Sequence, residues 1–222
     1  LLLMEYSRIY GVKKFIQIGT ASSYSDNAKI PFNEKDLWKD LPEDIIRPYS
    51  IAKIIQIIQQ EAYKKQYNFN AIHLLLANLY GPKDSFCPPR HVIPTMIKKI
   101  SEAKKTGQKK LVFWGNGNQE REFLYIEDAA EAIVLAMEKY NSINPINIGS
   151  GDTIKIKNLA QLLKDQIGFK GDILWDTNKP TGQIIRQLDN SKAKKAINFE
   201  AKTPLEIGLE KTISWYKTTK LK

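Results

Sequence analysis

Residue types that build metal and disulfide sites are scarce in this chain. It contains one cysteine, Cys87, which excludes an intramolecular disulfide and a multi-cysteine metal site. Of the two histidines, His73 lies within an apolar segment and is expected to be a hydrogen-bonded core residue, so we expect no bound metal. No apolar run approaches the about 18–20 residues that cross a bilayer. The apolar opening ends at Glu5 with no basic region before it, unlike a signal peptide. These absences predict a reduced, soluble, cytoplasmic protein without membrane contact.

Acidic residues are in the minority. The 34 basic and 24 acidic residues give a formal net charge of +10. A surface that binds single-stranded nucleic acid combines basic residues with aromatic residues for base stacking. Lysines cluster at 98–110 and again at 192–222, and the 98–110 cluster contains no aromatic residue. We therefore expect solvated lysine faces with a mild attraction for anionic ligands, and no nucleic-acid partner.

Apolar segments of strand and helix type alternate along the chain. The pattern predicts strands at 13–19, 71–77, 110–114, 145–148 and 172–175, and helices at 1–10, 49–67, 92–105, 127–140, 156–167 and 204–218. Such alternation is typical of an α/β fold with a parallel sheet and right-handed crossovers. The first helix has no strand before it, so we expect the chain to be N-terminally truncated.

A tyrosine and a lysine stand four residues apart at the start of the predicted helix 49–67. At that spacing Tyr49 and Lys53 lie on one helix face, with Cβ atoms about 5–6 Å apart. An ammonium beside a phenol favours loss of the phenolic proton, which makes Tyr49 a candidate acid–base group.

Hydroxyl side chains gather where the predicted strand 13–19 ends. Residues 19–24 read Gly-Thr-Ala-Ser-Ser-Tyr, which places Thr20 at the carboxyl end of a parallel strand. Open α/β sheets bind their ligands at that edge. A hydroxyl there can hydrogen-bond a substrate carbonyl while Tyr49 donates a proton, so the two segments together predict an active site.

Thr20, Tyr49 and Lys53 resemble the Ser/Thr–Tyr–Lys triad of the extended short-chain dehydrogenases/reductases, the NAD-dependent epimerase/dehydratase family. Segments similar to further signatures of that family occur at 77–82, 114–128, 146–151 and 205–216. Within it, 91–94, 121–124 and 176–182 are most similar to the GDP-L-fucose synthases, which act on a GDP-4-keto-6-deoxy-hexose. The resemblance covers nearly the whole chain. It implies a partial Rossmann-type doubly wound parallel sheet with a smaller α/β substrate-binding lobe.

The resemblance also implies roles for individual residues. Thr20, Tyr49 and Lys53 would be catalytic, and His91 would be the acid in epimerisation at C3 and C5. The cofactor would be NADP, with NAD as the alternative, and would contact Lys53, Ala77, Asn78, Leu79 and His91. The substrate, a nucleotide-diphosphate sugar, would contact Ser22, Asn78, Lys99, Trp114, Arg121 and Lys179.

One position departs from the fucose-synthase pattern. The family's epimerisation base is a cysteine two residues after the triad hydroxyl, and Ser22 stands there in this chain. Cys87 does not match that position. A serine without its own activating base is not deprotonated near neutral pH as a thiol is. Two alternatives therefore stay open: a 4-reductase or 4-epimerase acting on another nucleotide sugar, and a catalytically idle fragment.

The glycine-rich fingerprint of dinucleotide-binding proteins is missing. Gly115-x-Gly117 and Gly149-x-Gly151 both lack its third glycine. We therefore expect the fingerprint to precede this chain. Residues 1–80 would be the C-terminal part of the dinucleotide-binding domain, and 81–222 mainly the substrate-binding lobe, with segments around 110–150 returning to the core sheet.

The predicted helix 49–67 is apolar on more than one face. One stripe at helical spacing consists of Ile51, Ile54, Ile55, Ile58 and Ala62, and further apolar surface comes from Ala52 and Ile57. Such a helix is buried on more than its sheet side. Because the resembling family dimerises through this helix and the one before it, we expect a homodimer through helices 1–10 and 49–67.

Overall fold

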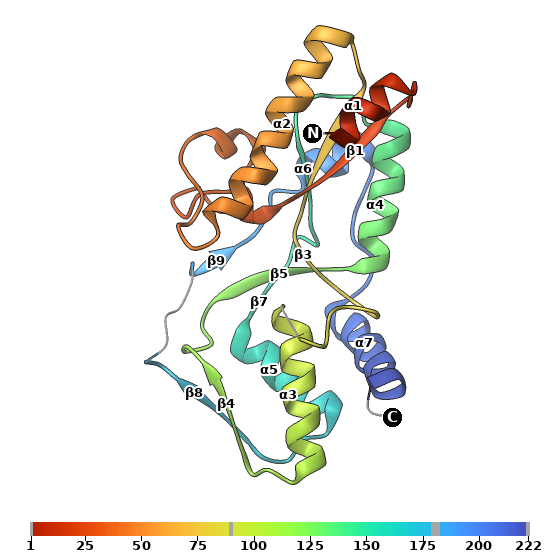
Figure 1. Cartoon of the computed structure of the whole chain (residues 1–222). Helices are drawn as coiled ribbons and strands as arrows, with labels where there is room; N and C mark the ends of the chain where they lie inside the picture. The colour runs from red at the N-terminus through yellow and green to blue at the C-terminus, as the bar shows by residue number, and fades with distance from the viewer. Residues whose placement is uncertain (1, 89–90, 179–182, 221–222) are drawn as a thin grey trace.

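The computed structural model describes residues 2–88, 91–178 and 183–220, so that Lys179 lies outside the described residues. These residues form two parts, each with its own sheet and core, joined by a small central sheet (Figure 1).

The first part is built on a three-stranded parallel sheet. Strands β1 (Phe15–Thr20), β2 (Ala71–Leu76) and β6 (Ile146–Ile148) pair in the order β1-β2-β6. Every residue of β2 is buried, as expected for a central strand that is covered on both faces. The free edge of β1 pairs with no other strand among the described residues.

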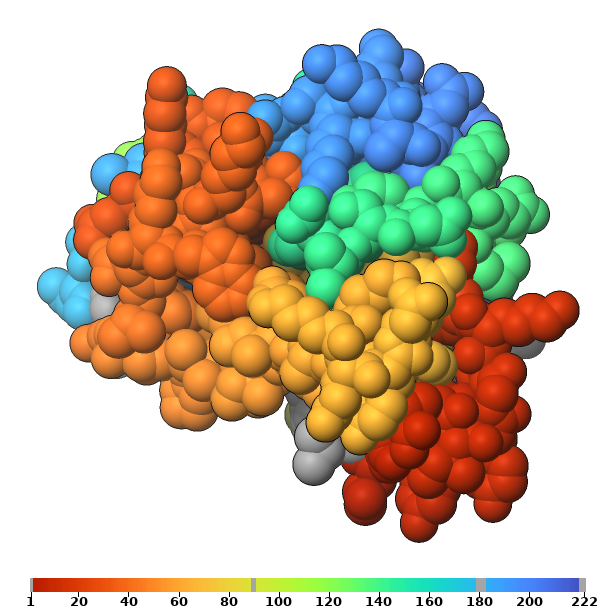
Figure 2. Space-filling model, turned by 90° about the horizontal axis from the view of Figure 1, so that it is seen from above, coloured from red at the N-terminus to blue at the C-terminus, as the bar shows by residue number. Residues whose placement is uncertain are grey.

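Four helices pack around this sheet. Helices α2 (Arg47–Tyr67) and α4 (Ile126–Lys139) lie on opposite sides of its strands (Figure 1). Helix α6 (Ser191–Ile197) packs against α4 and β6. Helix α1 (Leu2–Ile9) lies beside the C-terminal part of α2, where the Arg8 guanidinium stacks 4.2 Å from the centre of the Tyr67 ring (Figure 2).

The second part has a core of its own. Strand β4 (Lys110–Trp114) pairs in parallel with β8 (Asp172–Asp176). Helices α3 (Val92–Thr106), α5 (Ile156–Ile167) and α7 (Leu205–Lys220) enclose apolar side chains against this pair and the central sheet.

The central sheet connects the two parts. Strand β5 (Glu120–Tyr125) pairs in parallel with β3 (Asn78–Tyr80) and β9 (Ile185–Arg186), and antiparallel with β7 (Thr153–Lys155). The loop before α2 contains two short 3-10 helices, η1 (Ala21–Ser23) and η2 (Glu34–Trp38).

The predicted strands and helices are all present, with ends that differ by one or two residues. The sequence analysis missed β3, β5, β7, β9 and α6. The described strands form three separate sheets, and β7 runs antiparallel to β5, an orientation that the expected parallel pairing did not include. The first half of β5 reads Glu-Arg-Glu, and β7 and β9 are short. Such segments carry no hydrophobic signal, and their pairing depends on tertiary contacts.

The apolar stripe identified in the sequence of α2 is not the face that packs against the sheet. The helix buries Ser50, Ile54, Ile57 and Gln60. Ile57, which lay off the predicted stripe, is fully buried, whereas Ile55 and Ile58 are 55% and 51% exposed. The sheet selects a face that includes two polar residues because Gln60 Nε2 donates to the Ile72 carbonyl and Ser50 Oγ to the Ser22 carbonyl.

His73 is buried as predicted, but it is not hydrogen-bonded. Its side chain is fully enclosed, and neither ring nitrogen has a partner among the described residues. The ring takes the space above Gly19, where a Cβ atom would lie 2.1 Å from His73 Nε2. Burial lowers the pKa of His73 to about 4, and the nearby Lys53 charge acts in the same direction.

Candidate active site

A cavity of about 670 Å³ opens between the two parts, at the carboxyl ends of β1 and β2. Its wall is drawn from both parts: from β1, the start of α2, β3, the start of α3, β5 and β9. The lining residues are Ile18, Gly19, Thr20, Ser22, Ile46, Tyr49, Lys53, Leu76, Ala77, Asn78, Leu79, His91, Val92, Ile93, Phe123 and Arg186. Eight residues predicted from sequence therefore surround one space.

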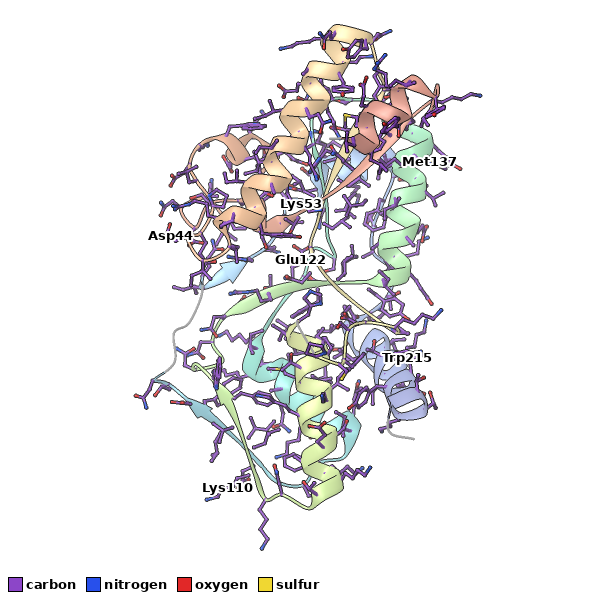
Figure 3. All side chains as sticks on the ribbon, in the orientation of Figure 1. Asp44, Lys53, Lys110, Glu122, Met137 and Trp215 are labelled. Carbon is purple, nitrogen blue, oxygen red and sulfur yellow. The ribbon has the colours of Figure 1, made fainter. Side chains whose placement is uncertain are left out.

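Thr20, Tyr49 and Lys53 share this cavity although they lie on different elements. Lys53 points from α2 toward β1 (Figure 3), and its Nζ donates to the Ile18 carbonyl at 2.8 Å. The same Nζ lies 6.0 Å from the centre of the Tyr49 ring. The Tyr49 side chain is 54% exposed at the cavity. A phenol beside an ammonium and open to the cavity can donate a proton to a bound carbonyl.

The residues around Thr20 are held by local hydrogen bonds. Thr20 Oγ1 accepts from the Ser22 backbone N–H at 3.2 Å, and Ser50 Oγ donates to the Ser22 carbonyl at 2.8 Å. No base touches the Ser22 hydroxyl among the described residues. The turn therefore presents the Thr20 hydroxyl at the strand end and leaves Ser22 unactivated.

His91 lies across the cavity, at the start of α3. It is the N-cap residue, but its side chain makes no capping hydrogen bond. Its Nδ1 lies 3.3 Å from Asp84 Oδ1, and the side chain is 65% exposed. An exposed imidazole oriented by a carboxylate through one nitrogen can exchange protons through the other.

Asn78 and Glu122 connect the cavity to the central sheet. Asn78 Nδ2 donates to the Glu122 carbonyl at 2.9 Å, so the Asn78 amide is engaged with the protein. The Glu122 side chain is buried between the two parts (Figure 3), and it accepts from the backbone N–H groups of Gly151 and Leu188 at 2.8 and 2.7 Å. Burial raises the pKa of Glu122, while these hydrogen bonds favour its charged form. The sequence analysis missed Glu122, because no local sequence pattern indicates its buried role between the two parts.

The Glu122 carboxylate also decides whether the Gly149-x-Gly151 pair can bind a phosphate. A Cβ at Gly149 would lie 2.1 Å from Glu122 Oε1, and the Gly151 N–H already donates to that oxygen. A phosphate-binding turn needs free N–H groups and no adjacent anion. This pair is therefore not a dinucleotide site, in agreement with the sequence analysis.

Two arginines stand side by side near the cavity. Arg121 on β5 and Arg186 on β9 are direct partners in the strand pairing, so their side chains leave the sheet on the same face. Arg121 lines an adjoining cavity of about 310 Å³, which shares Phe123 with the main one. Burial, and then the Arg186 charge, lower the pKa of Arg121 to about 10. The sequence analysis missed Arg186.

Arg121 and Arg186 differ in their partners. Arg121 Nη1 donates to the Glu120 carbonyl at 2.8 Å, and no carboxylate lies within 4.0 Å of its guanidinium in the described part of the chain. Arg186 is paired with Glu43 at 2.5 Å. A half-buried guanidinium that contacts no carboxylate among the described residues is a favourable place for an anion.

Two predicted substrate residues within the described ranges, Lys99 and Trp114, are not brought to this cavity. Lys99 Nζ lies 5.7 Å from the centre of the Phe113 ring, on the second part. Trp114 is 72% exposed on β4. Neither lines the cavity, and Lys179 lies outside the described residues. Within the described ranges, no three His, Cys, Asp or Glu residues are grouped to hold a metal, and no helix is long and apolar enough to span a membrane.

The fold and the cavity define a Rossmann-type enzyme unit with a tyrosine–lysine pair at the strand ends. The chain belongs to the NAD dependent epimerase/dehydratase family, whose model matches residues 1–149.

Individual relatives are consistent with that family. The chain is 40% identical to the GDP-L-fucose synthase of Sinorhizobium fredii, over 95% of this chain and 67% of that one. It is 38% identical to GDP-L-fucose synthase 1 of Arabidopsis thaliana, over 93% of this chain and 64% of that one. The chain thus spans two thirds or less of these curated relatives.

Solved structures confirm the predicted α/β, Rossmann-type fold class. A GDP-L-fucose synthetase from Naegleria fowleri superposes with a TM-score of 0.92 at 27% identity, covering 98% of this chain and 69% of that one. A GDP-mannoheptose C4 reductase from Campylobacter jejuni with NADP bound gives a TM-score of 0.87 at 29% identity, covering 97% and 71%.

Proposed function

We propose that this chain carries the acid–base residues and most of the substrate site of a nucleotide-sugar epimerase/reductase. The enzyme would convert a GDP-4-keto-6-deoxy-hexose to GDP-L-fucose with NADPH. The single observation that supports this most strongly is the cavity that collects Thr20, Tyr49, Lys53 and His91, next to an Arg121 guanidinium that contacts no carboxylate among the described residues.

The cavity fits the nicotinamide end of a dinucleotide. Lys53, Ala77, Asn78, Leu79 and His91 line it, and these are the residues that would hold the cofactor. A reduced nicotinamide cofactor, when bound, would supply the hydride. Residues 1–222 contain no complete dinucleotide fingerprint, so this chain holds only one end of that ligand.

The chain's own residues would handle the protons. The Tyr49 hydroxyl would donate a proton to the C4 oxygen of the sugar, and the Thr20 hydroxyl would hydrogen-bond that oxygen and orient it. The Lys53 ammonium lies where it stabilises the charge left on Tyr49. His91, oriented by Asp84, would return protons to C3 and C5 during epimerisation.

The diphosphate would lie against the arginine pair. Arg121 offers a guanidinium with no direct carboxylate partner among the described residues, and Arg186, which is paired with Glu43, presents a second guanidinium to the main cavity. Guanidinium groups bind phosphate oxygens through two parallel, charge-assisted hydrogen bonds. Lys99, Trp114, Asn78, Ser22 and Lys179 stay predicted contacts of the substrate.

A 4-reductase or 4-epimerase on another nucleotide sugar is the second candidate. Ser22 favours it, because this serine stands in the place of the epimerisation base and has no activating partner among the described residues. Such an enzyme would reduce or invert C4 without exchanging protons at C3 and C5.

Solvent proton exchange separates these candidates. We would fuse the N-terminal third of the Sinorhizobium fredii relative to residues 1–222 and incubate the fusion with a GDP-4-keto-6-deoxy-hexose in D2O. Deuterium at C3 and C5 of the product supports the epimerase/reductase. Reduction without deuterium at these carbons supports the 4-reductase, and an inactive fusion that binds GDP supports the idle fragment.

We further propose a homodimer in the cytoplasm. Large apolar side chains are exposed on α1 and on α2: Leu2, Leu3, Tyr6, Ile9, Ile55 and Ile58. Exposed apolar surface of this extent on adjacent helices is typical of a protein–protein interface.

In the same proposal, residues 1–80 belong to the dinucleotide-binding domain, and 81–222 are mainly substrate-binding, with 110–150 reaching back to the core sheet.

A further inference from the structure

Four charged side chains meet beside the main cavity. Arg186 Nη2 lies 2.5 Å from Glu43 Oε2 and 3.8 Å from Asp26 Oδ1. The neighbouring Arg121 is the strand partner of Arg186 and contacts no carboxylate among the described residues. The cluster therefore contains two guanidinium groups and two carboxylates, gathered from β5, β9 and the long loop before α2.

The carboxylates of this cluster oppose a diphosphate at Arg186 in particular. Arg186 is paired with Glu43 and lies near Asp26, and a diphosphate adds at least two negative charges to the same side. The pKa of Asp26 is raised by burial and by the Glu43 charge, so the two carboxylates already crowd one another. When the diphosphate joins Asp26 and Glu43 next to Arg186, repulsion between the three anionic groups favours the release of one of the two carboxylates.

Glu43 is the partner that can leave. It lies in the segment 39–46, which contains no helix or strand and exposes Leu41 and Ile45 by 55% and 83%. Because Leu41 and Ile45 are exposed, opening of the segment around Glu43 costs little apolar burial at these two residues. Arg186, in contrast, belongs to β9, and its Nε donates to Gln183 Oε1 at 2.8 Å.

We propose that Glu43 competes with the substrate's diphosphate for Arg186. This inference rests on the proposed function, because it takes a nucleotide diphosphate as the ligand. Glu43 holds the Arg186 guanidinium at the cavity wall, and an arriving diphosphate takes that guanidinium and releases Glu43 to solvent. A ligand with little negative charge would then fail to displace Glu43 from Arg186.

Release of Glu43 would reach the catalytic end of the cavity. Ile46, three residues later, lines the cavity and is the N-cap residue of α2, with no capping side chain of its own. Tyr49 follows in the first turn of the same helix. Loading of the diphosphate would therefore loosen 39–46 and change the contacts at the start of α2.

The test is a calorimetric titration of the 222-residue chain with GDP. We expect Glu43→Gln to bind GDP about tenfold more tightly than the wild type, because the amide competes poorly for Arg186. The matched control is Asp44→Asn, which removes the adjacent carboxylate, paired with Arg47 outside the cavity (Figure 3). It should change the affinity by less than about twofold. Arg186→Gln should weaken binding at least about tenfold.

The outcomes are distinct. If GDP binds and Arg121→Gln weakens it, but Glu43→Gln leaves the affinity unchanged or lower, Glu43 is a structural partner and the inference is overturned while the proposed function stands. Equal tightening by Glu43→Gln and Asp44→Asn also overturns it, since any lost negative charge would then suffice. Absence of GDP binding in every variant removes the proposed function itself, and this inference with it.

Hydrogen exchange on the wild type provides a readout that needs no variant. Saturating GDP should accelerate amide exchange in 39–46 and slow it in β5 and β9. Unchanged or slower exchange in 39–46 would contradict the release of Glu43.

Discussion

Lys53 links three features of the candidate site through one side chain. Its Nζ donates to the Ile18 carbonyl at 2.8 Å and stands 6.0 Å from the Tyr49 ring, while Thr20 lies two residues beyond Ile18. The ammonium thus ties α2 to the end of β1 and keeps the phenol near the hydroxyl. A lysine is suited to this task because its long stem reaches across the gap between helix and strand.

Removal of the Tyr49 hydroxyl tests the proposed proton donor. In the fusion enzyme described above, Tyr49→Phe should lower turnover at least about 100-fold, because a general acid contributes about 10²–10⁴-fold. The affinity for GDP should change little, since the arginines bind the diphosphate. Steady-state kinetics with a GDP-4-keto-sugar measures this, and a variant that keeps most of its turnover would exclude Tyr49 as the proton donor.

The buried His73 predicts a stability that depends on pH. Its pKa is lowered to about 4 in the folded protein, against about 6.5 in the unfolded chain. Between these values the unfolded chain binds a proton that the folded protein refuses, so the free energy of unfolding falls as the pH drops from about 6.5 to 4. At pH 5 the loss from this group should reach ~2 kcal/mol.

Urea unfolding at pH 7 and pH 5 measures this loss. His73→Leu should remove about that much of the difference between the two pH values, whereas the exposed His91→Gln should not. Equal pH dependence in the wild type and His73→Leu would show that His73 does not titrate as described.

At the scale of elements, α2 is held at both ends by different means. Its N-cap residue, Ile46, provides no capping side chain, and Ser50 instead ties the first turn to the Ser22 carbonyl at 2.8 Å. At the C-terminal end Asn68 takes the left-handed conformation that closes many helices. The N-terminal end of α2, which carries Tyr49, therefore depends on tertiary contacts. Its C-terminal end is set locally, by the backbone conformation of Asn68.

The exposed faces of α1 and α2 predict self-association. Ile55 and Ile58 are 55% and 51% exposed on α2, and Leu3 and Tyr6 are 74% and 55% exposed on α1. Light scattering of the chain at micromolar concentration should give a dimeric mass. Ile58→Asp should shift it to a monomer, because a charge in an apolar interface must be desolvated.

Ile207→Asp on α7 is the matched control, since Ile207 is 46% exposed on an unrelated face. A monomeric wild type, or equal effects of both substitutions, would contradict an interface through α1 and α2.

At the scale of the whole molecule, the cavity exists only because the two parts meet along the central sheet. Strand β1 and the start of α2 supply Thr20 and Tyr49, while α3 supplies His91. Glu122 holds this junction by accepting hydrogen bonds from Gly151 and Leu188. Each part has its own core, so the cavity is a feature of their contact.

The same architecture predicts weak cofactor binding by residues 1–222. Dinucleotides gain most of their affinity from a glycine-rich turn at a helix N-terminus, and this sequence has no complete fingerprint. Titration calorimetry with NADPH and NADH should show no binding at micromolar concentration and no reduction of a keto-sugar. The fusion with the N-terminal third of the relative is the control and should bind NADPH. Micromolar binding to the 222 residues alone would contradict this.

The sequence by itself was sufficient to predict the alternating α/β elements and the pairing of Tyr49 with Lys53. Both depend on local periodicity: apolar residues recur at helix or strand spacing, and residues four apart share a helix face. The site at the end of the 13–19 strand could be predicted for the same reason, because the carboxyl end of a parallel strand is set by chain direction.

Tertiary structure decided the features that join distant segments. The charged start of β5 pairs with β7 and β9, and the buried Glu122 receives backbone N–H groups from 151 and 188. Arg186 meets Glu43 across 143 positions of sequence. The ring of His73 fits against Gly19 and finds no hydrogen-bond partner among the described residues. No local pattern encodes these contacts, because each depends on which apolar faces bury first and which polar groups are then enclosed with them.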